Sequence, residues 1–241
     1  MDRIVRTNAL LEVLKSSPRR VNKILLQKEE GHRPLGAILG LAKANHVPTL
    51  FLPKQALDKM APHHQGVVAI LAPKEFTPLP EILEAAGRTP FLVLLDEIED
   101  PQNLGAILRN AEGAGADGIL LPERRSAGLT EAVAEVSAGA LAHLRVARVP
   151  NLVQTMTALK ERGIWLVGAE SGGDGRFFDF DYTQPVGVVL CSEGRGLRPL
   201  VRRTCDRILS IPIRGRVGSL NVGAAAAVFF FEIARQREKR R

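Results

Sequence analysis

Short apolar runs alternate with helical segments along most of this 241-residue chain, and that alternation restricts the fold more than any other feature. In the second part of the chain, the runs predict strands at Phe91–Asp96, 118–121, 143–146, 164–168, Val186–Cys191 and 208–213. Helices are expected between them at 103–113, 130–139, 151–161 and 197–203, with a long last helix from about Asn221. Strands that alternate with helices pair in parallel and are covered on both faces. We therefore expect an α/β domain with a mostly parallel sheet.

The first part of the chain shows a shorter alternation of the same kind. Strands are predicted at Val21–Gln27, 47–52 and Val67–Leu71, and helices at 8–15, 35–45 and Lys54–Met60. Residues 73–90 hold four prolines, which favour a linker, with room for a short helix at 81–86. The expected organisation is a small α/β domain at 1–72, a linker at 73–89 and a larger domain at 90–241.

The charge of the chain favours a polyanionic partner such as nucleic acid. The formal net charge is +7, and residues 1–88 hold 13 Lys and Arg against 8 Asp and Glu. Residues 89–241 hold 20 against 18. A basic surface attracts nucleic acid by its field, although the same charge also serves solubility alone. Contact with RNA or DNA is therefore expected in the first domain.

Several function classes are disfavoured by what the chain lacks. Its two cysteines, Cys191 and Cys205, form neither a disulfide framework nor a metal-ligand pattern, and this indicates a reducing, cytoplasmic location. His63 and His64 have no Cys or His at ligand spacing, so no metal site is expected. No leader segment opens the chain, and the apolar stretch at 222–231 is shorter than the ~20 residues that span a bilayer. No membrane association is expected.

Residues 113–118 match the dinucleotide fingerprint G-x-G-x-x-G, but in the wrong structural context. That fingerprint binds pyrophosphate only where it follows a strand and opens a helix. Here it ends a predicted helix and precedes a predicted strand. We interpret these glycines as helix-stop and turn residues, and do not expect a nicotinamide cofactor.

Three turns carry polar residues where ligands bind in α/β sheets. The first, 103–111, opens a helix; the second, 192–197, follows the strand Val186–Cys191; the third, 211–222, follows the strand at 208–213. Ligands of open α/β sheets bind at the carboxyl ends of strands, so these turns predict an active site. Each also has an ordinary structural explanation: Arg109 could pair with Glu112 or Asp100, residues 192–196 could be a plain strand–helix turn, and Ser219 could be a helix N-cap.

Taken together and in this order, the three turns resemble the motifs of the SpoU/TrmH family of RNA ribose methyltransferases, within the SPOUT class. Three segments carry the resemblance: N-x-G-x-x-x-R from Asn103 to Arg109, S-E-G-x-G-L from Ser192 to Leu197, and I-P at 211–212 with S-L-N-V at 219–222. The resemblance spans about 90–235. Residues 1–72, including H-Q-G-V at 64–67, resemble the family's ribosomal-protein-like RNA-binding domain.

The resemblance implies a fold, a cofactor and a partner. The catalytic domain would carry a C-terminal trefoil knot, S-adenosylmethionine would lie bent within it, and the protein would be a homodimer with the helix at 224–231 in its interface. By matching positions, cofactor contacts would come from Leu190, Cys191, Ser192, Gly194, Gly196, Ile211, Ile213, Ser219 and Leu220. The family usually has glycine where Cys191 stands, which implies a tighter pocket or a shifted loop.

The catalytic residues implied by the resemblance are Asn103, Arg109, Glu193, Ser219 and Asn221. Arg109 would hold the substrate phosphate and stabilise the developing negative oxygen, because a guanidinium with a pKa above ~12 is a poor base. Asn103 would orient Arg109 or the ribose, Glu193 would hold the loops, and Ser219 and Asn221 would position substrate and backbone. The RNA would be 23S rRNA, methylated on a guanosine ribose. The alternatives are a tRNA enzyme of the same family, or a non-catalytic RNA-binding protein of ribosome assembly.

Overall fold

The computed structural model describes residues 2–28, 33–61, 63–72, 74–192, 194, 196–216 and 218–238. The chain forms two compact units: the N-terminal unit, residues 1–75 with 129–143, and the C-terminal unit, residues 76–128 with 144–241. Two segments group differently from the expected domains. Helix α4 (Leu79–Ala86), within the expected linker, belongs to the C-terminal unit, and residues 129–143 belong to the N-terminal unit.

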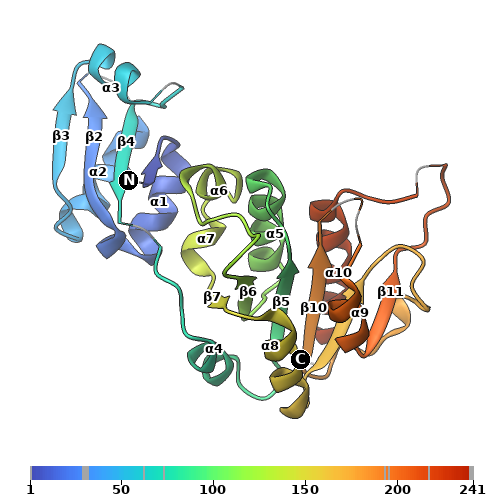
Figure 1. Ribbon diagram of the computed structural model, residues 1–241. Helices are drawn as coiled ribbons and strands as arrows, with labels where there is room; N and C mark the ends of the chain where they lie inside the picture. The colour runs from blue at the N-terminus through green and yellow to red at the C-terminus, as the bar shows by residue number, and fades with distance from the viewer. Residues whose placement is uncertain are drawn as a thin grey trace. The chain divides into compact units, whose positions relative to one another are not determined.

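The N-terminal unit is built on a four-stranded sheet in the order β1-β4-β2-β3. Its strands are β1 (Asp2–Ile4), β2 (Val21–Gln27), β3 (Thr49–Leu52) and β4 (Val67–Leu71). Strand β4 runs antiparallel to both β1 and β2, while β2 and β3 are parallel. The sheet is therefore mixed, and Figure 1 shows β3, β2 and β4 side by side.

Helices cover both faces of this sheet. On one face, side chains of α1 (Thr7–Ser16) and α2 (Arg33–Ala44), such as Leu10 and Ile38, are buried with Ile24 and Leu26 of β2. On the other face, Leu57 of α3 (Lys54–Met60) packs with Leu25. Ile24, Leu25 and Leu26 are all buried, with successive side chains on opposite faces, as a strand between two helical layers requires.

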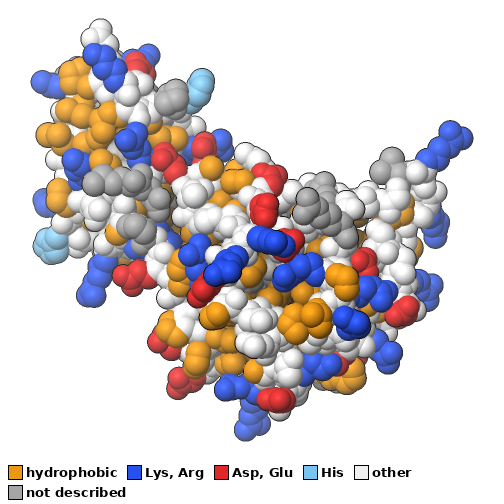
Figure 2. Space-filling model, in the orientation of Figure 1, with side chains coloured by type: hydrophobic (Ala, Val, Ile, Leu, Met, Phe, Trp, Pro, Cys, Tyr) orange, Lys and Arg blue, Asp and Glu red, His pale blue; other side chains and the backbone are white. Residues whose placement is uncertain are grey.

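The surface of the N-terminal unit carries unpaired lysines. Five exposed ones have no ion pair or hydrogen bond within the described part of the chain: Lys23, Lys28, Lys43, Lys54 and Lys59. Blue side chains are spread over the visible face of this unit in Figure 2. The expectation of a basic first domain agrees with this surface.

The C-terminal unit holds a seven-stranded sheet in the order β7-β6-β5-β10-β8-β11-β9, and every pairing in it is parallel. The strands are β5 (Phe91–Asp96), β6 (Gly118–Pro122), β7 (Val146–Val149), β8 (Trp165–Ala169), β9 (Gly175–Arg176), β10 (Val186–Cys191) and β11 (Arg207–Ser210). The strand order changes direction between β5 and β10. The central strands β5, β6 and β10 are buried almost throughout, because helices cover both faces of the sheet. The predicted parallel α/β sheet is confirmed.

Two helical layers sandwich the parallel sheet. Helices α4, α8 (Leu152–Glu161) and α9 (Pro199–Thr204) pack on one face, where Ile82, Met156 and Val201 join the buried core. Helices α5 (Pro101–Gly113) and α10 (Val222–Glu238) lie against each other on the other face, and the Phe230 ring of α10 meets Phe91 edge-on at 5.5 Å. Among the described residues, no helix combines the length and the hydropathy needed to cross a membrane.

Three predicted elements differ from the structure. The helix predicted at 130–139 is two helices, α6 (Glu131–Val136) and α7 (Ala140–His143), because Ala138 and Gly139 have positive φ values of 52° and 98°. The strand predicted at 143–146 is wrong in position, since β7 begins where that prediction ended. Strand β11 ends at Ser210, before Pro212, which has no N–H for a sheet ladder.

The glycines at 113–118 lie where the sequence interpretation placed them. Gly113 is the last residue of α5, Gly115 has a φ of 75°, and Gly118 is the first residue of β6. A Cβ at Gly118 would collide with Ile82 of α4, so this glycine serves the packing of a helix on the sheet.

Candidate active site

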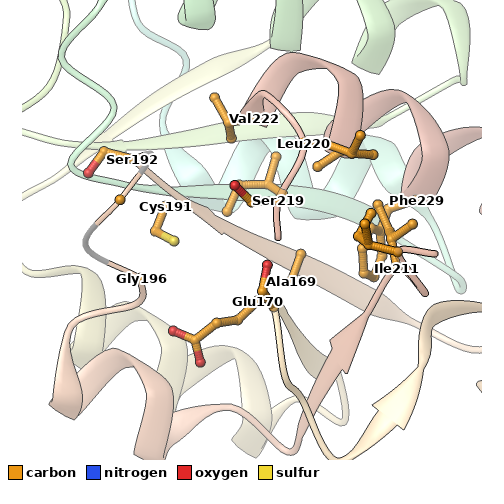
Figure 3. A pocket seen from close by; sticks show the side chains of 15 residues that line it. Ala169, Glu170, Cys191, Ser192, Gly196, Ile211, Ser219, Leu220, Val222 and Phe229 are labelled. Atoms are coloured by element: carbon orange, nitrogen blue, oxygen red, sulfur yellow. The ribbon is translucent and has the colours of Figure 1, made fainter. Parts of the chain in front are cut away.

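A cavity of about 380 Å³ lies where β8, β10 and β11 end. These three strands are neighbours in the sheet, so the residues that follow them meet at one edge. Fifteen residues line it: Ala169, Glu170 and Ser171 at the end of β8; Leu190, Cys191, Ser192, Gly194 and Gly196 at the end of β10; Ile211, Ile213, Ser219 and Leu220 after β11; and Val222, Ala225 and Phe229 of α10. Figure 3 shows these segments around the cavity, with Ser219 and Leu220 across from Cys191.

The turn after β10 contains two glycines in the left-handed region. Gly194 and Gly196 have φ values of 81° and 69°, which side chains rarely allow. A Cβ at Gly196 would also collide with Oε1 of Glu170. The expected strand–turn–helix order is present, because β10 precedes this turn and α9 follows it. Glu193 lies outside the described residues, so its predicted role has no structural description here.

Two carboxylates fix the end of this turn. Leu197 N–H donates to Glu170 Oε1 at 3.0 Å, and the next amide, Arg198 N–H, donates to Asp96 Oδ2 at 3.1 Å. The Arg198 guanidinium also donates to Asp96 Oδ1, through Nε at 2.7 Å. Asp96 is only 1% exposed, and a buried carboxylate needs such partners to compensate its lost hydration.

The third segment reaches the first through asparagines. Asn221 Oδ1 accepts the Gly223 N–H at 2.9 Å, so Asn221 caps the start of α10. Its Nδ2 donates to Asn103 Oδ1 at 2.9 Å. The ordinary explanation of Ser219 as the N-cap is therefore wrong, because residues 218–221 precede the helix, which begins at Val222. Ser219 lines the cavity instead.

Helices α5 and α10 are held close together beside the cavity. Asn110 Nδ2 donates to the Gly223 carbonyl at 2.8 Å, and a Cβ on Gly223 would lie 2.9 Å from Ala106 Cβ. Gly223 thus permits a close approach of the two helices. The first and third turns are more than a hundred residues apart in sequence, and these contacts hold them side by side.

Arg109 lies on the exposed surface of α5 and is not among the residues that line the cavity. In the described part of the chain it has neither a hydrogen bond nor an ion pair, so the pairing considered with Glu112 or Asp100 does not occur. Asp100 instead caps α5 by accepting the Gln102 N–H at 3.0 Å. Arg109 is therefore available for an anionic partner.

The Cys191 thiol faces the cavity in its neutral form. Burial, and secondly the charges of Glu170 and Asp96, raise the pKa of Cys191 to about 12. A thiol with this pKa is neither a nucleophile nor a metal ligand at neutral pH. Among the described residues no group of three or more His, Cys, Asp or Glu could hold a metal ion.

All nine residues expected to contact a cofactor line the one cavity, and Ser219 of the expected catalytic residues lines it too. Asn103 and Asn221 are joined beside it. Sequence reasoning missed Ala169, Glu170, Ser171, Val222, Ala225 and Phe229. The signal for the first three was available, because they follow the predicted strand 164–168 and strand ends share an edge.

Comparison with known proteins gives the same assignment in both parts of the chain. Residues 90–231 match the model of the SpoU rRNA Methylase family, and residues 7–77 match the model described as RNA 2'-O ribose methyltransferase substrate binding. A putative TrmH family tRNA/rRNA methyltransferase, YacO of Bacillus subtilis, is 40% identical over 98% of this chain and 96% of its own. The 23S rRNA (guanosine-2'-O-)-methyltransferase RlmB of Pseudomonas putida is 36% identical over 100% of this chain and 99% of its own.

A solved structure is similar over nearly the full length of the chain. The SpoU methyltransferase AviRb from Streptomyces viridochromogenes, in complex with the cofactor AdoMet, superposes with a TM-score of 0.83 at 26% identity, over 98% of this chain and 90% of its own. The cavity lined by the second and third turns, the Asn221–Asn103 contact that joins the first turn to the third, and these matches agree with one another. The chain belongs to the SpoU/TrmH family of RNA methyltransferases.

Proposed function

We propose that this protein transfers the methyl group of S-adenosylmethionine to the 2′-hydroxyl of a ribose in structured RNA, and that its target is a guanosine of 23S rRNA. The observation that carries the proposal is the meeting of the three turns at one place, with the first and third joined by the Asn221–Asn103 hydrogen bond beside the cavity. The 23S target rests on the full-length similarity to the RlmB protein.

The cavity fits the proposed cofactor in size and in chemistry. Its volume of about 380 Å³ is within the usual range of small-molecule sites. Ile211, Leu220 and Phe229 offer apolar contact, and the turn with Gly194 and Gly196 lets backbone groups approach a planar polar ring. Leu190, Cys191, Ser192, Ile213 and Ser219 complete the proposed cofactor contacts.

When bound, S-adenosylmethionine supplies a methyl group activated by a sulfonium. The chain must hold a ribose hydroxyl in line with that methyl and stabilise the negative charge that develops on its oxygen. Arg109 is the unpaired cation of α5 for this task, holding the substrate phosphate and the developing oxyanion. The hydroxyl proton leaves to phosphate or water, because the guanidinium is already protonated.

The asparagines and Ser219 position these groups. Asn103 stands at the start of α5 and is oriented by Asn221, so it fixes the helix that carries Arg109. Ser219, on the cavity wall, places the ribose. The role proposed for Glu193, from its place in the second motif alone, is to hold the loops. The RNA-binding domain is residues 1–72, the linker 73–89 and the catalytic domain 90–241. The match at 7–77 supports this division, although residues 129–143 group with the N-terminal unit.

The proposal includes a homodimer, a knot and a cytoplasmic location. Exposed apolar side chains of the C-terminal unit, Ile213, Leu220 and Phe231, are 37%, 40% and 50% exposed and offer a surface for a second copy. Large apolar side chains gathered near a site are typical of an interface. The knot would involve the chain from β10 through α10, and both cysteines are free thiols, as a reducing compartment favours.

The test is methyl transfer from labelled S-adenosylmethionine to 23S rRNA and tRNA transcripts, with the modified position mapped by its resistance to alkaline cleavage. We expect a single 2′-O-methylguanosine in 23S rRNA. Arg109→Ala should lower kcat about 1,000-fold while the calorimetric Kd for the cofactor stays unchanged, since the lost interaction acts on the transition state. Methylation of tRNA alone would redirect the target, and cofactor binding without transfer to any RNA would favour the non-catalytic alternative.

A further inference from the structure

The Glu170 carboxylate occupies a central place in the wall of the cavity. Glu170 is the first residue after β8, and its backbone N–H donates to Leu209 O of β11 at 3.1 Å, which fixes it to the sheet. Its side chain is 20% exposed. Figure 3 shows it pointing toward the turn that carries Gly196 rather than across the cavity. Its contacts are therefore with the protein.

Each oxygen of the Glu170 carboxylate accepts a hydrogen bond from a different donor. Oε1 accepts the Leu197 N–H at 3.0 Å and packs against the α-carbon side of Gly196, where no Cβ would fit. Oε2 accepts from Arg202 Nε at 2.8 Å, one turn into α9. This hydrogen bond raises the pKa of Arg202, whose side chain is 45% exposed. The carboxylate thus joins the turn to the helix that follows it.

The position of Glu170 in the sheet explains why one side chain can set the turn. Strand β10 has β5 on one side and β8 on the other. Asp96, which ends β5, accepts the Arg198 N–H, and Glu170, which follows β8, accepts the Leu197 N–H. Two consecutive amides are therefore held from opposite sides of β10. The turn between Cys191 and Leu197 is anchored at its far end by these two carboxylates.

We propose that Glu170 is a positioning residue for the cofactor, which holds the turn at 192–197 in its binding conformation through the Leu197 amide. This inference rests on the proposed function, since it assigns S-adenosylmethionine to the cavity. A turn with two residues at positive φ has many conformations open to it when its end is released, because glycine is the most permissive residue. An ordered turn removes that entropy loss from the binding step.

A set of three variants of the full chain separates this role from that of the ion pair with Arg202. Glu170→Ala removes both contacts. Glu170→Asp keeps the charge but shortens the side chain, so that it no longer reaches the Leu197 amide. Arg202→Met keeps the amide contact and removes only the ion pair. Glu161→Ala, at the exposed end of α8, is a matched control for loss of a glutamate.

Calorimetry with S-adenosylmethionine should show the Kd raised about tenfold in Glu170→Ala and about fivefold in Glu170→Asp, as expected for loss of preorganisation. Arg202→Met and Glu161→Ala should stay within about twofold of the parent protein. The KM for the cofactor should rise with the Kd, while kcat at saturating cofactor and the KM for RNA should not change. A purely structural defect would lower kcat and the thermal midpoint together.

Three outcomes would overturn the inference: cofactor binding by Glu170→Ala at parental strength, binding by Arg202→Met as weak as that of Glu170→Ala, or unimpaired binding by Glu170→Asp. If Glu170→Ala does not fold, the cofactor Kd values of Glu170→Asp and Arg202→Met decide the question. Glu170→Asp should again bind the cofactor about fivefold more weakly than the parent protein, and Arg202→Met should stay within about twofold of it. Absence of cofactor binding by the parent protein is a distinct result, which would reject the proposed function and this inference with it.

Discussion

The N-terminal sheet is mixed and the C-terminal sheet is parallel throughout, and the two units differ accordingly in what their strand ends can do. In the mixed sheet, β4 runs against β1 and β2, so residues that end neighbouring strands lie at opposite edges. In the parallel sheet, Asp96, Glu170, Cys191 and Ile211, at or just after strand ends, come to one edge. A cavity with convergent polar groups is built there.

The two units contribute to function through different physical means. The N-terminal unit offers exposed, unpaired lysines, which act at long range and with little geometric demand. The C-terminal unit instead holds a few polar groups at fixed distances from one another, at the ends of its parallel strands. Substitutions in the parallel sheet's turns should therefore change cofactor binding and turnover, whereas substitutions on the N-terminal unit should change RNA affinity or stability alone.

The strongest test of this contrast is Gly196→Ala. The new Cβ would collide with Glu170 Oε1 at a φ of 69°, so the carboxylate must leave the Leu197 amide or the turn must move, and the Kd for S-adenosylmethionine should rise at least about tenfold. Gly163→Ala is the matched control, since Gly163 has a φ of 77° but nothing within 4 Å of a Cβ. It should lose stability and keep the Kd. An equal loss of cofactor affinity in both variants would show that backbone strain at a glycine of positive φ, and not the collision with Glu170, weakens cofactor binding.

A second test concerns the joint between the first and third turns. Asn221→Ala removes the cap on Gly223 N–H and the contact with Asn103, so the free energy of unfolding should fall by about 1 kcal/mol and kcat by about tenfold. Asn151→Ala removes another cap, the one that accepts Gln154 N–H on α8. That control should match the loss in urea unfolding and leave kcat intact. A kcat for Asn221→Ala equal to that of the control would reject the joint as a positioning element.

A third test replaces exposed lysines of the N-terminal unit. Replacing the five unpaired lysines, Lys23, Lys28, Lys43, Lys54 and Lys59, by glutamine should weaken RNA binding about fivefold at 0.15 M salt and flatten its salt dependence. The Kd for the cofactor and the thermal midpoint should not change, because these side chains have no described partners. An unchanged salt slope in a filter-binding titration would show that RNA is held elsewhere.

Much of this architecture could be predicted from local sequence, and the exceptions have physical causes. Strands β2, β4, β5 and β10 have the predicted bounds, because each is an apolar run closed by turn residues. Strand β1 was not predicted, since three residues have no pattern of their own and depend on pairing with β4. The run at 143–146 alternates like a strand, yet His143 ends α7, which packs on the N-terminal unit.

The candidate site divides in the same way. Residues within the three turns could be found by their motifs, and all nine expected to contact the cofactor share one cavity. Glu170 belongs to no motif, and only its place after the predicted strand at 164–168 pointed to the cavity edge. Its contact with the Leu197 amide and its approach to Gly196 could not be predicted. Those are tertiary facts. Likewise, Asn221 rather than Ser219 caps α10, because the helix begins only at Val222.

The smallest expected effect concerns residues 129–143, which group with the N-terminal unit although their neighbours in sequence do not. Lys74 Nζ donates to Leu141 O at 2.7 Å and to Ala142 O at 3.4 Å, at the end of α7. Burial, and secondly the charge of Arg20, lower the pKa of Lys74 to about 8. In the unfolded chain a lysine titrates near ~10.4.

Between these two pKa values the unfolded chain binds more protons than the folded one, so stability rises with pH. The free energy of unfolding should increase by about 1 kcal/mol from pH 8 to pH 9 because of Lys74 alone. Urea unfolding of the parent protein and of Lys74→Met across this range isolates the difference, since every other lysine is common to both. The two proteins should bind the cofactor equally. Parallel pH profiles would show that Lys74 is not the titrating group, whereas a changed cofactor Kd would show that the segment acts on the active site as well as on stability.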